Sequence, residues 1–288
     1  MAIIKIRPID LKEYDPDTLK HLQCVLMDIF KDFIKICDEN NIQYFLHAGT
    51  SIGAVRHHGF IPWDDEIDVA LFREDYEKLL KILDQPDEKY YVSNWKHRFN
   101  IDDESYTPKT LFCLKNTKLK NYGPECNIYD FGIYVDINVL DDIPTNKIKK
   151  FLYIKIMYFV TFLISLSNSI ECDLYTSKKN EWLGNRIKFL FKIFNIPNIS
   201  AKIYTRLMKK YQGKCDMVCS TGEGVYIEKP FPKSCFDNSI SVKFEDIYVN
   251  LPEGYDETLK IFYGNYMEMP PVSERFNHNW DVIDFGEY

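Results

Sequence analysis

The sequence predicts an α+β fold, in which flanking helices cover a mixed β-sheet and a helical segment is inserted after Val139. Three observations predict this class. Apolar residues recur at helical spacing in 15–40 and 73–83, short apolar stretches of strand length follow them, and residues 146–211 are mostly helical in pattern. The chain has 288 residues, 45% of them hydrophobic, so it can bury a large core.

Each element follows from local spacing and turn residues. Asp15 or Asp17 can cap the first helix, and Gly59 is expected to end a short helix at 52–58 in the left-handed conformation. Strands are expected at 43–47, 65–72, 90–94, 110–115 and 133–139, then a hairpin or a single strand at 239–249 and a helix at 255–263. We therefore expect a core at 1–145, a basic helical insertion at 146–235, and a C-terminal segment at 236–288 that packs back on the core.

Charge is distributed unevenly along the chain. The formal net charge is −7, yet residues 147–210 contain 13 Lys or Arg and only 3 Asp or Glu. The negative total argues against general nucleic-acid binding, whereas the basic segment indicates an anionic partner.

The cysteines and the N-terminus predict a cytoplasmic protein with reduced thiols. Among eight cysteines only Cys215 and Cys219 are close together, which is weak evidence for zinc. The opening residues MAIIKIRPID lack an apolar stretch of signal-peptide length.

The segment PWDDEIDVALF carries the strongest chemical signal. Alternate side chains of a strand share a face, so Asp64, Glu66 and Asp68 are expected to point one way. The apolar residues at 67, 69 and 71 then point into the core. Crowded carboxylates repel one another unless a cation lies among them, and hard oxygen ligands suit Mg²⁺ or Mn²⁺. The alternative is a solvated acidic edge strand.

A second acidic strand, IYVDINVLDD, supports the metal site. Asp136 lies on a face opposite to Val135 and Ile137, and a carboxylate on such a buried strand needs a partner. A metal shared with Glu66 and Asp68 would supply it. The alternative is an ion pair with a nearby Lys or Arg.

Residues 48–51 are predicted to form a tight turn before a helix. Backbone N–H groups at such a position favour a phosphate, Gly49 permits close approach, and the hydroxyls of Thr50 and Ser51 can donate hydrogen bonds. The same residues also suit an ordinary helix cap. Arg56 on that helix and Lys115 at a strand end are further candidates for binding phosphate.

The stretch GTSIGAVRHHGFIPWDDEIDVALFREDYEKLL closely resembles the LicD family of phosphotransferases. The segments YVDINVLDDIP at 134–144 and GYDETLKIFYGNYMEMPP at 254–271 also look like that family. The resemblance implies a nucleotidyltransferase-like fold with Glu66, Asp68 and Asp136 as metal-binding acids and Asp64 as the first acid of the cluster. Two departures are Glu66 in place of the usual Asp, and Asn138-Val139 in place of a common Phe-Pro.

The resemblance also implies a reaction. The family, and the similar fukutin-related proteins, transfer a phospho-alcohol from a CDP-linked donor to a hydroxyl of a glycan. For this chain it implies a donor such as CDP-choline, release of CMP, Mg²⁺ or Mn²⁺, and a glycan or lipid-linked glycan acceptor, as in teichoic acid or lipopolysaccharide synthesis. Asp136, or Asp64 as the second candidate, would accept the proton of the hydroxyl, and Asp68 is expected to be essential.

A choline group would need aromatic faces, because a quaternary ammonium forms no hydrogen bonds. Trp63, beside the carboxylates, is the first candidate, and Tyr266 and Trp280 follow. Each of these rings could instead belong to the core.

The apolar segment 151–166 has 16 residues, fewer than the ~20 that a membrane-spanning helix needs. It is either part of a core helical hairpin with a basic outer face or an interfacial helix that docks on an anionic membrane. Two other functions stay open for the whole chain. One is a nucleotidyltransferase that modifies a small molecule or RNA and releases pyrophosphate. The other is a non-catalytic scaffold that binds a glycan or partner.

Overall fold

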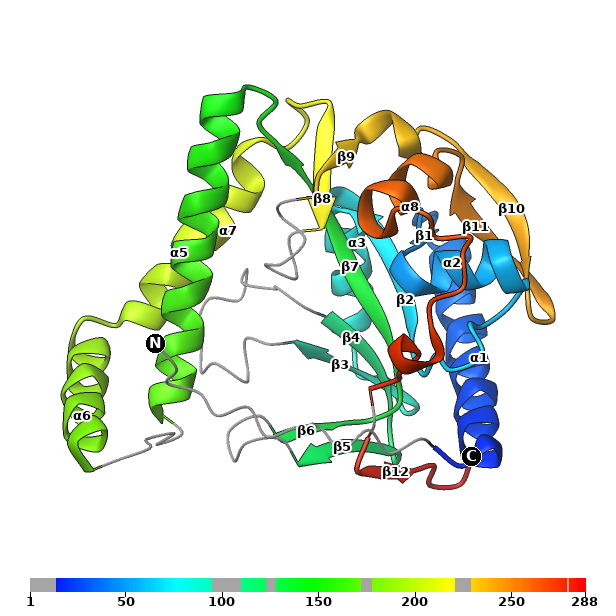
Figure 1. Cartoon of the computed structure of the whole chain (residues 1–288), viewed down its shortest axis with the longest axis horizontal. Helices are drawn as coiled ribbons and strands as arrows, with labels where there is room; N and C mark the ends of the chain where they lie inside the picture. The colour runs from blue at the N-terminus through cyan, green and yellow to red at the C-terminus, as the bar shows by residue number, and fades with distance from the viewer. Residues whose placement is uncertain (1–13, 95–109, 123–127, 172–177, 221–228, 279) are drawn as a thin grey trace.

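The computed structural model describes residues 14–94, 110–122, 128–171, 178–220, 229–278 and 280–288. Helices and strands are mixed along the chain and pack together (Figure 1), which confirms the α+β class. The helices are α1 (Pro16–Glu39), α2 (Ala48–His57), α3 (Arg73–Leu83), α5 (Lys147–Glu171), α6 (Lys178–Ile193), α7 (Ile196–Lys210) and α8 (Tyr255–Tyr263).

The main sheet is built around β7, the longest of its strands in the described residues. β2 runs parallel to β7 on one side, while β4 and β8 lie antiparallel along its first and second halves on the other. The strands of this sheet are β1 (Phe45–Leu46), β2 (Ile67–Phe72), β3 (Tyr90–Asn94), β4 (Thr110–Leu114), β7 (Tyr134–Ile143), β8 (Met217–Ser220) and β9 (Phe231–Pro232).

Two smaller sheets flank it. A three-stranded sheet has the order β12-β5-β6, and a hairpin pairs β10 with β11. Their bounds are β5 (Lys118–Tyr122), β6 (Ile128–Phe131), β10 (Ser239–Phe244), β11 (Ile247–Pro252) and β12 (Val282–Asp284). The hairpin is one of the two alternatives predicted for 239–249. The strands β5, β6, β8, β9 and β12 were not predicted, because they are short and alternate weakly or contain many polar residues.

The main core lies between α1 and one face of the sheet. α1 begins where Asp15 accepts a hydrogen bond from the amide of Thr18, with Pro16 at the first helical position. Its buried side chains, among them Phe30 and Phe33, pack into the same cluster as Val69. Burial of these large side chains on both elements fixes which face of the sheet points inward.

A second cluster joins the helical segment to the sheet. One side of α5, including Tyr153 and Met157, packs with Tyr204 and Met208 of α7 and with Cys219 of β8. In Figure 1, α5 and α7 lie side by side at one edge of the sheet. Among the described residues, no helix is both long enough and apolar enough to cross a membrane.

One predicted helix end was wrong in detail. His58, rather than Gly59, ends α2 in the left-handed conformation, with φ of 58°. A Cβ atom on Gly59 would lie 2.2 Å from Oε1 of Glu245, so that flexible side chain would have to move to admit a larger residue.

Candidate functional site

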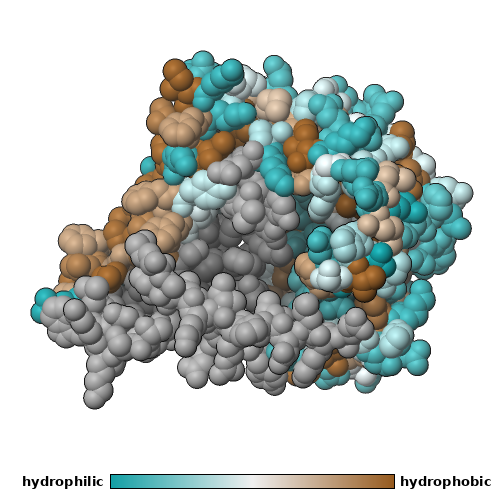
Figure 2. All heavy atoms as spheres, in the orientation of Figure 1, coloured by the Kyte–Doolittle hydropathy of each residue, from teal (hydrophilic) through white to brown (hydrophobic). Residues whose placement is uncertain are grey.

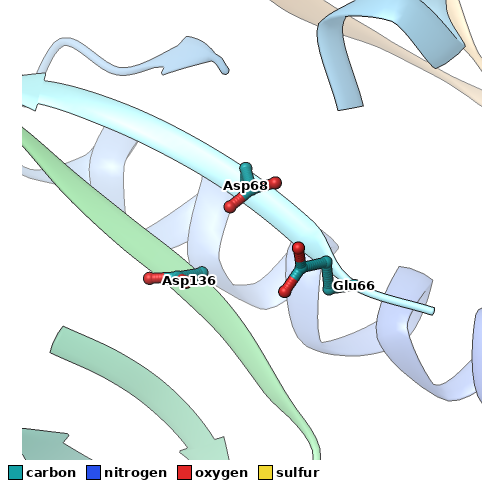
Figure 3. A group of neighbouring side chains, drawn as sticks. All are labelled: Glu66, Asp68 and Asp136. Carbon is teal, nitrogen blue, oxygen red and sulfur yellow. The ribbon is translucent and has the colours of Figure 1, made fainter. Parts of the chain in front are cut away.

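Three carboxylates converge on neighbouring strands of the main sheet. Glu66 precedes β2, Asp68 lies on β2, and Asp136 lies on β7 (Figure 3). The two strands are parallel and in register, with Asp68 directly opposite Asp136. One carboxylate oxygen from each of the three residues lies within 4.8 Å of the others. The structure thus brings together the three residues that the sequence suggested as metal ligands.

The sheet buries two of these acids because the strands that carry them are core strands. The apolar residues that alternate with them, such as Val69 and Ile137, belong to the main core, which confirms the predicted faces. Asp68 and Asp136 are buried on the opposite face, with exposures of 8% and 2%, while Glu66 is partly exposed. Burial of like charges is unfavourable unless a cation or hydrogen bonds compensate them.

The backbone of Asp68 is fixed by the start of α2. The Asp68 amide donates to Oγ1 of Thr50 over 2.8 Å, and the His47 amide donates to the Asp68 carbonyl over 3.0 Å. The predicted turn at 48–51 is therefore the first turn of α2, which already begins at Ala48. The Ser51 amide donates to the His47 carbonyl within the helix, and phosphate binding by Gly49, Thr50 and Ser51 stays a prediction.

Polar side chains extend the cluster along β7. The side-chain Nδ2 of Asn138 donates to Oδ1 of Asp68 over 3.4 Å, and the Ser220 hydroxyl donates to Oδ1 of Asn138 over 3.3 Å. All three residues are buried. Asn138, which departs from the common family pattern, thus helps to orient a cluster carboxylate, and β8 supplies a contact that the sequence did not predict.

Asp64 lies just before β2, close enough to Glu66 for the two carboxylates to interact. Its amide donates to the carbonyl of Ile61, so the residue belongs to a turn before β2. Oδ2 of Asp64 lies 3.3 Å from where a Cβ on Gly49 would be, which places its carboxylate against the first turn of α2. Burial and the neighbouring Glu66 and Asp65 carboxylates raise the pKa of Asp64 to about 8.

The C-terminal segment contributes His278, which sequence reasoning missed. Nδ1 of His278 lies 2.8 Å from Oδ1 of Asp65, and Nε2 lies 3.6 Å from Oε2 of Glu66. Asp65 also accepts a hydrogen bond from the Tyr14 hydroxyl. The 213 positions between Asp65 and His278 leave no local pattern that could have revealed this contact.

The two predicted basic phosphate ligands have other partners in the structure. Nη1 of Arg56 donates to the carbonyls of Tyr266 and Glu268, so it ties α2 to the C-terminal segment. The Lys115 ammonium donates to the Asp87 carbonyl. Position 111 of β4, not 115, lies opposite Asp136, and four residues span about 13 Å along a strand. Phosphate binding by either residue stays a prediction.

The three predicted aromatic ligands occupy different surroundings. Trp63 is partly exposed, and the guanidinium of Arg275 lies 5.2 Å from its ring centroid. Trp63 packs against a small apolar cluster that contains Ile61 and Tyr266. Tyr266 is buried there, and its hydroxyl donates a hydrogen bond to Asp256. Trp280 instead belongs to the main core, edge-on to Tyr134. A choline pocket at these rings stays a prediction, and the structure brings Trp63 and Tyr266, rather than all three, into one cluster.

The comparisons with known proteins agree with this location. A family model described as "LicD/FKTN/FKRP, nucleotidyltransferase domain" matches residues 41–151, which include all three clustered acids. The lipopolysaccharide cholinephosphotransferase LicD of Haemophilus influenzae is 27% identical over 272 residues, which cover 91% of this chain and 96% of that protein. The uncharacterized protein RP689 of Rickettsia prowazekii is 33% identical over 116 residues, which cover 38% of this chain and 44% of that protein.

The match to the family model and the match along nearly the whole chain both involve LicD proteins. The family model covers the segment from β1 to the start of α5, and the Haemophilus protein aligns with nearly all of the chain. The chain therefore resembles the LicD family of phosphotransferases over the segment that carries the clustered acids and, at 27% identity, along nearly its whole length.

Proposed function

We propose that this protein transfers a phospho-alcohol, first of all phosphocholine, from a CDP-linked donor to a hydroxyl of a cell-surface glycan, with release of CMP. The observation that carries the proposal is the cluster of Glu66, Asp68 and Asp136 inside the segment that matches the family. The name of the Haemophilus relative supplies the phosphocholine and the lipopolysaccharide acceptor.

The donor set of the cluster fits a hard divalent cation. Three carboxylate oxygens within 4.8 Å of one another suit Mg²⁺ or Mn²⁺, which prefer oxygen ligands. Glu66, Asp68 and Asp136 would hold the ion, and a bound ion would neutralise charge on the donor diphosphate. A nucleotidyltransferase-like arrangement of strands, with two acids at one strand and a third on its neighbour, is part of this proposal.

The residues around the cluster position the reactants. Thr50 and Asn138 hold Asp68, and the first turn of α2 presents its amide end to the donor phosphates. The proton of the attacking hydroxyl passes to a carboxylate of the site, with Asp136 as the first candidate and Asp64 as the second. Trp63 contributes an aromatic face for a quaternary ammonium.

A panel of donors tests the proposal directly. The full chain is incubated with Mg²⁺, a lipopolysaccharide or teichoic acid acceptor, and CDP-choline, CDP-ethanolamine, CDP-glycerol or CDP-ribitol. We expect acceptor-dependent release of CMP with at least one donor, and loss of activity in excess EDTA. Release of pyrophosphate from a nucleoside triphosphate, without CMP from any donor, would instead support a nucleotidyltransferase. Absence of metal and donor binding by calorimetry would favour a non-catalytic scaffold.

A further inference from the structure

The exposed apolar side chains of this protein are concentrated on its helical segment. Of the 20 large hydrophobic residues that are exposed in the described part of the chain, 12 lie between 148 and 203. Brown, hydrophobic spheres follow the α5 side of the molecule in Figure 2. Apolar patches of this kind on a folded surface mark a contact with another surface.

The patch is best defined on α5. At about 100° of rotation per residue, its exposed apolar side chains fall within an arc of about 140° on one side of the helix. They extend along about 21 Å of its length. The members are Ile148, Phe151, Leu152, Ile156, Phe159 and Phe162, with exposures from 43% to 72%. We call this set the outer face of α5.

The outer face is not required for the packing of the chain on itself. Tyr153, Met157, Val160 and Ile164 lie on the opposite side of α5, are all buried, and pack against α7 and β8. The helix therefore already has a packed side. A second apolar side of similar size, left in water, is unfavourable unless a partner covers it.

The charge around the outer face is positive. Lys147 and Lys149 flank its first turn, and Lys155 lies within it, with Nζ 5.6 Å from the centroid of the Phe151 ring. Such lysines can cover apolar surface with their stems and extend the ammonium outward. The sequence has no Asp or Glu from 147 to 170 or from 182 to 210, whereas the whole chain is acidic.

We propose that the outer face of α5 docks on an anionic membrane surface, with α5 lying along the surface rather than crossing it. An interfacial helix combines an apolar face with Lys or Arg beside it, and anionic lipids attract those cations. Docking of a second copy through this face would bring two basic surfaces together, which charge repulsion opposes. Charge complementarity therefore selects the membrane as the occupant.

Co-sedimentation of the full chain with lipid vesicles tests the proposal. We expect binding to phosphatidylcholine vesicles that contain about 30% phosphatidylglycerol, and about tenfold weaker binding to pure phosphatidylcholine. Salt at about 0.5 M should release most of the bound protein. Neither metal nor donor is needed, so this result is independent of the proposed transfer reaction.

Two sets of variants separate the apolar and the electrostatic contributions. Phe151→Ser with Phe159→Ser should weaken vesicle binding about tenfold or more, because the variant lacks two exposed rings that would insert into the lipid surface. Lys147→Gln with Lys149→Gln should weaken binding about tenfold to anionic vesicles and leave binding to neutral vesicles unchanged. The matched control, Tyr248→Ser with Val272→Ser, removes two apolar side chains of 72% exposure outside the helical segment and should bind like the wild type.

Several results would overturn the proposal. These are no binding to anionic vesicles, equal binding to neutral and anionic vesicles, or unchanged binding by the Phe151→Ser, Phe159→Ser variant with circular dichroism like the wild type. A concentration-dependent dimer in light scattering that the same variant loses, without lipid binding by the wild type, would assign the outer face to a second copy of the chain.

Discussion

β7 and α5 are neighbours in the chain, separated by three residues, but β7 buries polar side chains whereas α5 exposes apolar ones. Every residue of β7 is buried, including Asp136, Asn138, Asp141 and Asp142. α5 buries one side and exposes six large apolar side chains on the other. Polar groups inside and apolar groups outside both cost free energy, so each set indicates a partner.

The largest expected effect comes from the buried acids. Asp68→Asn should lower the rate of CMP release about 10³-fold or more, because a charged ligand of the proposed ion is lost while the shape is kept. Mg²⁺ should raise the Tm of the wild type and not that of the variant. Asp246→Asn, which changes an exposed carboxylate on the β10–β11 turn, should have nearly full activity.

Near-normal activity of Asp68→Asn at saturating Mg²⁺ would remove the site from the mechanism. It would also mean that the buried Asp68 carboxylate contributes to the stability of the fold and not to metal binding. The stability measurement distinguishes these cases, because a purely structural Asp68 would change Tm and leave the metal response intact.

The second prediction concerns a buried charge on β7 that has a partner within the chain. Arg73 and Asp141 are 3% and 1% exposed, and Nε of Arg73 donates to Oδ1 of Asp141 over 2.8 Å. Arg73→Leu should lower the free energy of unfolding by about 3–5 kcal/mol, because it leaves the carboxylate buried without its cation. Urea unfolding measures the change.

A double variant keeps that experiment informative if the single variant fails to fold. Arg73→Leu with Asp141→Leu removes both charges and should be more stable than Arg73→Leu alone. If the double variant were the less stable of the two, the Asp141 charge would not be the source of the loss.

Local alternation made the centre of the site predictable. In β2 and β7 apolar residues occupy every second position on either side of Asp68 and Asp136, so the sequence indicated both the core face and the clustered acids. The pairing of the two strands in register could not be read from that pattern. It depends on parallel contacts between residues about 68 positions apart, such as Asp68 with Asp136.

Contacts between distant segments were beyond sequence reasoning. β5 pairs with β12 through Lys118 and Asp284, and His278 lies against Asp65, although neither pair shares a local signal. Arg56 and Lys115 were assigned from their positions near the motif, yet carbonyl groups of other segments accept hydrogen bonds from both. Side chains as long as these reach several neighbours, so sequence position alone did not determine their partners.

The third prediction addresses the link between α2 and the cluster. Thr50→Val removes the hydroxyl that accepts from the Asp68 amide and leaves that buried amide without this hydrogen bond. We expect a loss of about 1–2 kcal/mol in the free energy of unfolding and a higher Mg²⁺ concentration for half-maximal activity. Thr50→Ser keeps the hydroxyl and should restore the metal response. A metal response of Thr50→Val equal to the wild type would show that α2 does not position Asp68.

The smallest expected effect concerns the exposed apolar side chains of α5. Phe159 is 61% exposed, so Phe159→Ala should change the free energy of unfolding by no more than about 0.5 kcal/mol. Met157 lies two residues earlier on the buried side, and Met157→Ala should cost about 2 kcal/mol or more. Urea unfolding without lipid measures both. Equal losses would mean that the outer face packs within the protein, whereas the expected difference leaves its six apolar side chains available for a partner.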